Sequence, residues 1–255
     1  MIESIILGVI QGVTEFLPIS STAHLILFPW FFDWNGDVDT LTFDMALHAG
    51  TLAALFACFW RDWRDLVRIK QKLLMFILIG TIPAGAAGFY LNDIVAGALR
   101  SPILISVMLI SVGLVMLVAE KMYKYKAMDE VQLSDAVMIG IAQTLALIPG
   151  VSRSGITIAA GLFRGFEREA AAHFSFLLST PLITAAVVLH GAALGTSPEP
   201  YNMKLFVSGF IASTVTGYIA LKFLLSFLKK YPLNIFVYYR FALAAVIIAL
   251  VWLKG

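Results

Sequence analysis

Long apolar runs alternate with short polar connections along this chain. Of its 255 residues, 60% are hydrophobic and 13% are charged, whereas about a quarter of the residues in a soluble domain are usually charged. A helix needs about 20 apolar residues to cross a bilayer, and six runs approach that length. They are Leu41–Trp60, Leu73–Leu91, Ile103–Ala119, Ala170–His190, Leu205–Leu228 and Ile235–Leu253. The pattern predicts a polytopic helical membrane protein with no room for a large soluble domain.

Basic residues gather in alternate connections, and this indicates how the helices are oriented. The basic segments are Arg61–Lys72, Lys121–Lys126, Arg164–Arg168 and Lys229–Lys230. The connections that are poor in Lys and Arg are Asp33–Thr40, Asn92–Ser101 and Gly191–Lys204. Basic loops tend to remain in the cytoplasm. We therefore expect the basic segments inside, and Asp33–Thr40 and both termini outside.

Two apolar stretches do not fit a single crossing. Val131–Phe163 has basic segments on both sides, so the chain must return to the face from which it entered. We interpret this stretch as a re-entrant hairpin of two half-helices, broken at Pro149 and Gly150. By analogy, Ile2–Trp30 forms a hairpin that is broken at Pro18 and enters from outside.

The two halves of the chain resemble each other at a nearly constant offset. Gly8–Gln11 reads GVIQ and Gly140–Gln143 reads GIAQ, and both precede a proline and a serine-rich turn. A pair of glycines eight residues apart begins at Gly80 and recurs from Gly209. Each half holds one hairpin and three spans. Because three is an odd number of crossings, the second half is expected to be inverted, as in many transporters.

The predicted fold is therefore an all-α polytopic membrane protein with an inverted-topology repeat, each half holding one re-entrant helical hairpin plus three transmembrane helices. It is a single membrane domain over residues 1–255, with repeats at about 1–121 and 132–255. The two hairpins enter from opposite faces and meet near the middle. Irregular backbone at membrane depth is tolerated where protein buries it or a wet cavity hydrates it. The two turns are thus the expected functional site.

Both turns place hydroxyl side chains after a proline, at the start of an apolar half-helix. Ser and Thr are good helix N-caps, and a helix N-terminus attracts anions through its free N–H groups and dipole. The second turn adds Arg153, whose guanidinium suits phosphate oxygens. The candidate phosphate-binding hydroxyls are Ser20, Thr22, Ser152, Ser154 and Thr157.

Glu15 suggests chemistry rather than passive anion binding. A carboxylate repels phosphate unless it binds a cation or handles a proton. Gln11 lies one helical turn earlier, so its amide oxygen is a candidate neutral metal ligand beside Glu15. Ser21 supplies an oxygen nucleophile and His24, three residues later, a candidate acid or base.

Asp44 and His48 form a further candidate pair, because they are spaced i, i+4 on the outer half of a span. They can support the residues that bind the ligand without contacting the ligand themselves. A simple hydrogen bond on a helix surface explains the spacing equally well.

The stretches QGVTEFLPISSTAH (Gln11–His24) and PGVSRSGIT (Pro149–Thr157) resemble the two signature regions of the undecaprenyl-diphosphate phosphatase family, also called the bacitracin resistance protein family. The resemblance covers essentially the whole chain, including FDMALHAGTLAA at Phe43–Ala54. It implies an integral inner-membrane enzyme that hydrolyses undecaprenyl diphosphate to the monophosphate carrier lipid. It also implies dependence on a divalent cation, Mg²⁺ or Ca²⁺.

By position, Gln11 and Glu15 match the E/Q-x-x-x-E motif of that family. Ser21 and His24 match its proposed nucleophile and acid/base, and Arg153 matches the arginine of its P-G-x-S-R-S-G motif. The first motif position is often Glu in the family, so Glu15 is the one carboxylate in this turn. This casts doubt on a mechanism that needs two carboxylates to hold the metal.

The resulting hypothesis is hydrolysis of a polyprenyl diphosphate at the outer, periplasmic face, either through a phosphoserine at Ser21 or by direct attack of water. A transporter of the lipid monophosphate or of a small anion is the main alternative, and an anion channel would leave Glu15 unexplained. We expect the lipid bilayer, but no nucleic acid, as a partner. The sequence leaves a homodimer open.

Overall fold

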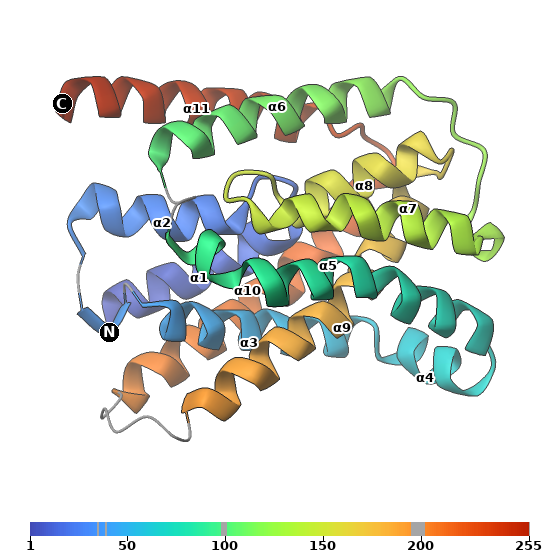
Figure 1. Cartoon of the computed structure of the whole chain (residues 1–255), viewed down its shortest axis with the longest axis horizontal. Helices are drawn as coiled ribbons and strands as arrows, with labels where there is room; N and C mark the ends of the chain where they lie inside the picture. Colours follow the sequence, from blue (N-terminus) through green and yellow to red (C-terminus); the bar gives the residue numbers. More distant parts are fainter. Residues whose placement is uncertain (35, 39, 98–100, 195–201, 255) are drawn as a thin grey trace.

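The computed structural model describes residues 1–34, 36–38, 40–97, 101–194 and 202–254, and these form helices joined by short loops. An isolated bridge joins Lys126 to Phe166. Figure 1 shows long helices running roughly alongside one another. The helices in chain order are α1 (Ile2–Phe16), α2 (Ser21–Phe32), η1 (Gly36–Val38), α3 (Leu41–Cys58), α4 (Trp60–Arg68), α5 (Gln71–Gly97), α6 (Pro102–Glu120), η2 (Met128–Glu130), α7 (Leu133–Thr144), η3 (Leu145–Leu147), α8 (Arg153–Phe163), α9 (Arg168–Leu194), α10 (Met203–Leu228) and α11 (Asn234–Lys254).

Six helices in the described ranges are long and apolar enough to cross a membrane, which confirms the prediction of a polytopic helical protein. The six segments are Leu41–Cys58, Gln71–Leu91, Pro102–Glu120, Arg168–Gly191, Met203–Leu228 and Asn234–Leu253. Large apolar side chains such as Phe89, Val188 and Trp252 are exposed on their outer surfaces. In a membrane protein such side chains face lipid, which is as apolar as they are.

The connection predicted over Arg61–Lys72 is in part a helix, which corrects the sequence reading. The span α3 ends at Cys58, and Trp60 begins the short helix α4 instead of closing the span. The charged residues of α4 lie among apolar ones at helical spacing, so Leu66 is buried while Trp60 and Val67 remain exposed. Such an amphipathic segment is typical of a helix at the membrane interface.

Both re-entrant stretches fold as broken hairpins. In the first, α1 ends at Phe16 and α2 begins at Ser21, on either side of Pro18. In the second, α7 and η3 end at Leu147 and α8 begins at Arg153, after Pro149 and Gly150. Figure 1 shows α1–α2 opening toward the end that carries both termini and α7–α8 opening toward the other end, so that the two turns lie between them.

The order of helices repeats, in line with the sequence offset. Helices α1, α2, α3, α5 and α6 are followed by α7, α8, α9, α10 and α11, with α4 inserted in the first set. Helix α1 packs on α10 where Gly8 meets Gly209, and α7 packs on α5 where Gly140 meets Gly80. A Cβ at Gly140 would lie 2.0 Å from the Gly80 carbonyl oxygen, so glycine permits this close approach. The orientation of the halves across a membrane stays a prediction.

Some of the connections used for the orientation argument fall partly outside the described residues. These positions are Asn35, Asp39, residues 98–100 with Arg100, and residues 195–201 within Gly191–Lys204.

Candidate active site

The two hairpin turns share the same local geometry at equivalent positions. Ser20 and Ser152 are the N-caps of α2 and α8, and their side chains accept hydrogen bonds from the Ala23 and Gly155 N–H groups at 3.4 and 3.2 Å. Both serines have positive φ, 75° and 69°, which is uncommon outside glycine and is concentrated at functional sites. Each turn thus presents the N-terminus of a half-helix to the interior.

Glu15 joins the two turns. Its Oε2 accepts hydrogen bonds from Ser21 Oγ at 2.5 Å and from Gln11 Nε2 at 3.0 Å. Its Oε1 pairs with the guanidinium of Arg153 from the second hairpin. Ser21 and Arg153 are the first residues of α2 and α8, 132 positions apart. The structure therefore gathers three of the predicted site residues, Gln11, Ser21 and Arg153, around a fourth, the buried carboxylate of Glu15.

His48 is a further neighbour of this carboxylate. It lies on α3, and its Nε2 is 3.7 Å from Glu15 Oε2. Its Nδ1 lies 2.8 Å from the backbone oxygen of Asp44. The two residues of the predicted pair are thus joined by a hydrogen bond from the His48 ring to the backbone oxygen of Asp44. This hydrogen bond turns the His48 ring toward the site.

His24 bonds groups other than Glu15. Its Nδ1 lies 2.7 Å from the Ser20 carbonyl oxygen and its Nε2 lies 2.7 Å from the Tyr239 hydroxyl. Both ring nitrogens are thus engaged by groups outside the Glu15 cluster. The acid/base role that the resemblance implies for His24 stays a prediction.

The other predicted hydroxyls mainly hold the turns together. Ser154 Oγ donates to the Leu17 carbonyl of the other turn at 3.2 Å and lies 3.3 Å from Ser152 Oγ. Thr157 Oγ1 donates to the Arg153 carbonyl at 2.7 Å and lies 2.5 Å from Ser175 Oγ. Thr22 is exposed, unlike its buried neighbours Ser21 and Ala23.

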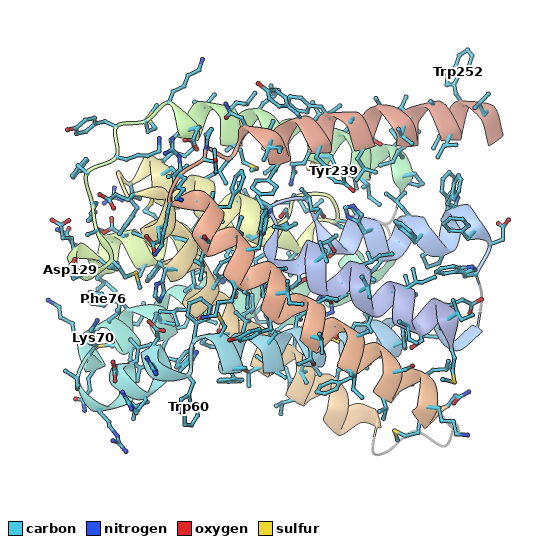
Figure 2. The ribbon with its side chains drawn as sticks, turned by 180° about the vertical axis from the view of Figure 1, so that it is seen from behind. Trp60, Lys70, Phe76, Asp129, Tyr239 and Trp252 are labelled. Atoms are coloured by element: carbon cyan, nitrogen blue, oxygen red, sulfur yellow. The ribbon has the colours of Figure 1, made fainter. Side chains whose placement is uncertain are left out.

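Arg240 is a residue of this region that the sequence analysis did not single out. It lies on α11, is completely buried, and donates hydrogen bonds to five backbone carbonyls. Those carbonyls belong to the first turn, the second turn and α6, namely Pro18, Gly150, Val151, Met108 and Leu109. A lone arginine within an apolar span is the available signal, because an ionisable group at membrane depth is functional by default. Figure 2 labels its neighbour Tyr239, which lies in the first third of α11.

The donor groups around Glu15 fit a divalent cation. In the described part of the chain no three His, Cys, Asp or Glu side chains come together, so Glu15 supplies the one carboxylate. The amide oxygen of Gln11 is buried with no hydrogen-bond partner among the described residues. Such an orphaned acceptor costs about 1–3 kcal/mol unless something satisfies it. An oxygen-seeking cation bound by Glu15 and Gln11 would satisfy it.

The comparisons with known proteins identify the family. A sequence model described as "Bacitracin resistance protein BacA" matches residues 4–246. The chain belongs to this family. The match covers both hairpins and all but the end of α11, so the whole Glu15 cluster and Arg240 lie within the BacA family region.

Relatives in the BacA family carry the name undecaprenyl-diphosphatase. The protein of that name from Thermodesulfovibrio yellowstonii is 55% identical over 255 residues, which are 100% of this chain and 99% of the relative. Those from Desulforudis audaxviator and Thermomicrobium roseum are 44% and 42% identical, over 99% and 98% of this chain and 98% and 97% of the relatives. The resemblance found from the two motifs is thereby confirmed over the full length.

Proposed function

We propose that this protein is a membrane phosphatase that hydrolyses undecaprenyl diphosphate to undecaprenyl phosphate and inorganic phosphate. This activity would recycle the carrier lipid for cell-wall synthesis and give resistance to bacitracin. The observation that carries the proposal is the contact of one carboxylate, Glu15, with a hydroxyl from one turn and a guanidinium from the other. The relatives' names support the choice of substrate.

The geometry suggests how the first step proceeds. Ser21 Oγ already donates its hydrogen to Glu15 Oε2, so Glu15 is placed to accept the proton as Ser21 attacks the terminal phosphorus. The new bond joins Ser21 Oγ to phosphorus, and the bond from phosphorus to the bridging oxygen breaks. Undecaprenyl phosphate leaves, and water then cleaves the phosphoserine to release phosphate.

Charge stabilisation comes from the second turn and from both helix ends. The Arg153 guanidinium has five N–H donors, so it can bind phosphate oxygens while still contacting Glu15. The first N–H groups of α2 and α8 have no partner within their helices, and they favour the charge that builds up on phosphate. A divalent cation, Mg²⁺ or Ca²⁺, held by Glu15 and Gln11 would add a Lewis acid for the phosphoryl oxygens.

The proposed location is the cell membrane, with the site open to the outer face. This rests on the positive-inside reading of the basic segments, since the first hairpin is then entered from outside. The carrier lipid diphosphate is released on that face after glycan transfer. The apolar tail would lie among the spans or in the bilayer.

The decisive experiment measures phosphate release from undecaprenyl diphosphate by protein purified in detergent with Mg²⁺ or Ca²⁺. We expect release by the unaltered protein and its loss, by about 10³-fold or more, in Ser21→Ala. Thr14→Val is the matched control, because Thr14 precedes Glu15 but its hydroxyl donates to the Ile10 carbonyl at 2.7 Å.

A transporter would release no phosphate in detergent, where no gradient exists. A phosphoserine trapped at Ser21 by mass spectrometry would distinguish the covalent route from direct attack by water.

A further inference from the structure

We infer that His48 is a ligand of the divalent cation in this site. Its Nε2 supplies a metal-binding atom that is stronger than the amide oxygen of Gln11. The inference rests on the proposed function only in that it places a cation at Glu15. It extends that proposal by assigning a nitrogen to the coordination shell, and so it changes which metals the site prefers.

The tautomer of His48 follows from its hydrogen bond. A backbone carbonyl oxygen can only accept, so the Nδ1 that lies 2.8 Å from the Asp44 oxygen carries the ring hydrogen. In the neutral ring, Nε2 then presents a lone pair. Metal-binding histidines are typically held in this way, with the other ring N–H donated to a carbonyl or carboxylate.

That lone pair faces another acceptor. Nε2 is 3.7 Å from Glu15 Oε2, too far for a hydrogen bond. Two donor atoms bound to one cation through bonds of about 2.1 Å lie at most about 4.2 Å apart, so the separation admits a shared ion. A cation between the two atoms would bind Nε2 and Oε2 together, while Oε2 also accepts the hydrogen bonds from Ser21 and Gln11.

The buried amide oxygen of Gln11 is a second, independent reason to expect a cation here. The Gln11 Nε2 donates to the same Oε2 at 3.0 Å, which is the sensible orientation of the amide beside a carboxylate. Its oxygen is then left buried without a partner among the described residues. The same small group of side chains thus holds a carboxylate, an orphaned amide oxygen and an imidazole lone pair.

The charge of the site also suits a cation. Glu15 and Arg153 compensate each other, so the cluster has no net charge with which to attract a diphosphate. A bound dication would make it strongly positive. An imidazole ligand favours transition metals over Ca²⁺ and Mg²⁺, which prefer oxygen. We therefore expect this protein to bind Mn²⁺ more tightly than Ca²⁺.

The test is pulsed electron paramagnetic resonance of the purified protein loaded with Mn²⁺, prepared without a polyhistidine tag. A nitrogen ligand gives modulation from ¹⁴N that a merely structural histidine does not give. We expect this modulation in the unaltered protein and in His24→Gln, and its absence in His48→Gln. The His48 variant should also bind Mn²⁺ about tenfold or more weakly, with a smaller change in Ca²⁺ binding.

A second variant decides the matter even if His48→Gln fails to fold. The chain has four histidines, so replacing His24, His173 and His190 by Gln leaves His48 alone. The modulation must persist in that protein. Its absence there or in the unaltered protein, or its persistence in folded His48→Gln, would overturn the inference. An ion pair with a protonated His48 gives no ¹⁴N modulation and would be revealed in this way.

Phosphate release, measured on the same preparations, separates the two proposals. Release without ¹⁴N modulation would leave the phosphatase standing and remove His48 from the metal. Modulation that depends on His48 without any release would do the opposite.

Discussion

At the scale of single residues, Gln11 and Gln143 show how the two halves have diverged. They occupy equivalent positions, 132 apart, and both are buried. Gln11 is followed one turn later by Glu15, whose carboxylate accepts its N–H. The position equivalent to Glu15 is Leu147, and both polar atoms of the Gln143 side chain lack a partner among the described residues. On the proposed function, this carboxylate makes the first copy the one that carries the chemistry.

Replacing Gln11 by Glu should make the fold depend on metal. A second carboxyl group would face Glu15 Oε2 at about the distance of the present hydrogen bond. Two carboxyl groups that close cannot both ionise without a cation between them. We expect a lower melting temperature than the unaltered protein in a chelator, and recovery on addition of Ca²⁺. Differential scanning fluorimetry in detergent measures both.

Gln143→Glu is the control for that experiment. It buries a carboxylate at the equivalent position without a neighbouring carboxylate to complete a metal site, so the melting temperature should fall and stay low with Ca²⁺. Equal rescue of both variants would mean that Ca²⁺ stabilises the protein elsewhere.

The sequence was enough to predict part of the site but not all of it. The spacing Gln11–Glu15 and the turn serines were enough to predict which side chains gather, because these contacts lie within one hairpin or follow from the repeat. The sequence did not predict that His48, rather than His24, lies next to the Glu15 carboxylate. This placement depends on how α3 and α11 pack against α1 and α2, and on which side chain each ring meets. No local spacing encodes those long-range contacts.

At the scale of elements, α11 acts as a brace for both turns. Arg240 bonds Pro18 of one turn and Gly150 and Val151 of the other. Tyr239, the preceding residue, bonds His24. The sequence predicted α11 as an ordinary span, since apolar length was its dominant feature. The broken helices leave backbone carbonyls free at the two turns. Only the structure shows that Arg240 of α11 binds these carbonyls and so holds the two turns together.

Arg240→Lys should impair catalysis more than it impairs stability. A lysine keeps the charge but has three donors on a single nitrogen, so it cannot reach carbonyls of three separate segments. A shift of about 1 Å between the turns is enough to lower the turnover number about 10²-fold. Steady-state kinetics should show a fall in kcat with a smaller change in KM.

Leu66→Ala provides the comparison for Arg240→Lys. Leu66 is buried in α4, a helix that lies apart from both turns (Figure 1), so its truncation should destabilise by about 2–5 kcal/mol while kcat is kept. If the two variants lose kcat in proportion to their loss of melting temperature, Arg240 serves stability alone.

The packing of α7 on α5 gives a second prediction for an element. In Gly140→Ala the new methyl group would lie 2.0 Å from the Gly80 carbonyl oxygen, so α7 must move away from α5. Because α7 leads into the second turn, both the melting temperature and phosphate release should fall. Gly85→Ala on α5 is the matched control, since nothing lies within 4 Å of its added Cβ. It should be neutral or stabilise by up to about 1 kcal/mol.

At the level of the whole molecule, the basic segments gather at one end along the helix direction. Figure 1 shows α4 and the loop after α6 at one end and both termini at the other. Figure 2 likewise places Lys70 and Asp129 at the end opposite Trp252. Basic residues near span ends orient a membrane protein, so this arrangement predicts which end is cytoplasmic and hence from which side the first hairpin is entered.

Labelling of single cysteines in intact cells tests this orientation. The chain has one cysteine, Cys58, so a Cys58→Ser background gives a blank. Cysteines are then placed at Lys70, which is exposed at the basic end, and at Met203, which is exposed at the start of α10. A reagent that cannot cross the membrane should label Met203→Cys from outside and reach Lys70→Cys only after permeabilisation. The reverse pattern would place the first hairpin on the cytoplasmic face, and labelling of both from outside would contradict the helix arrangement itself.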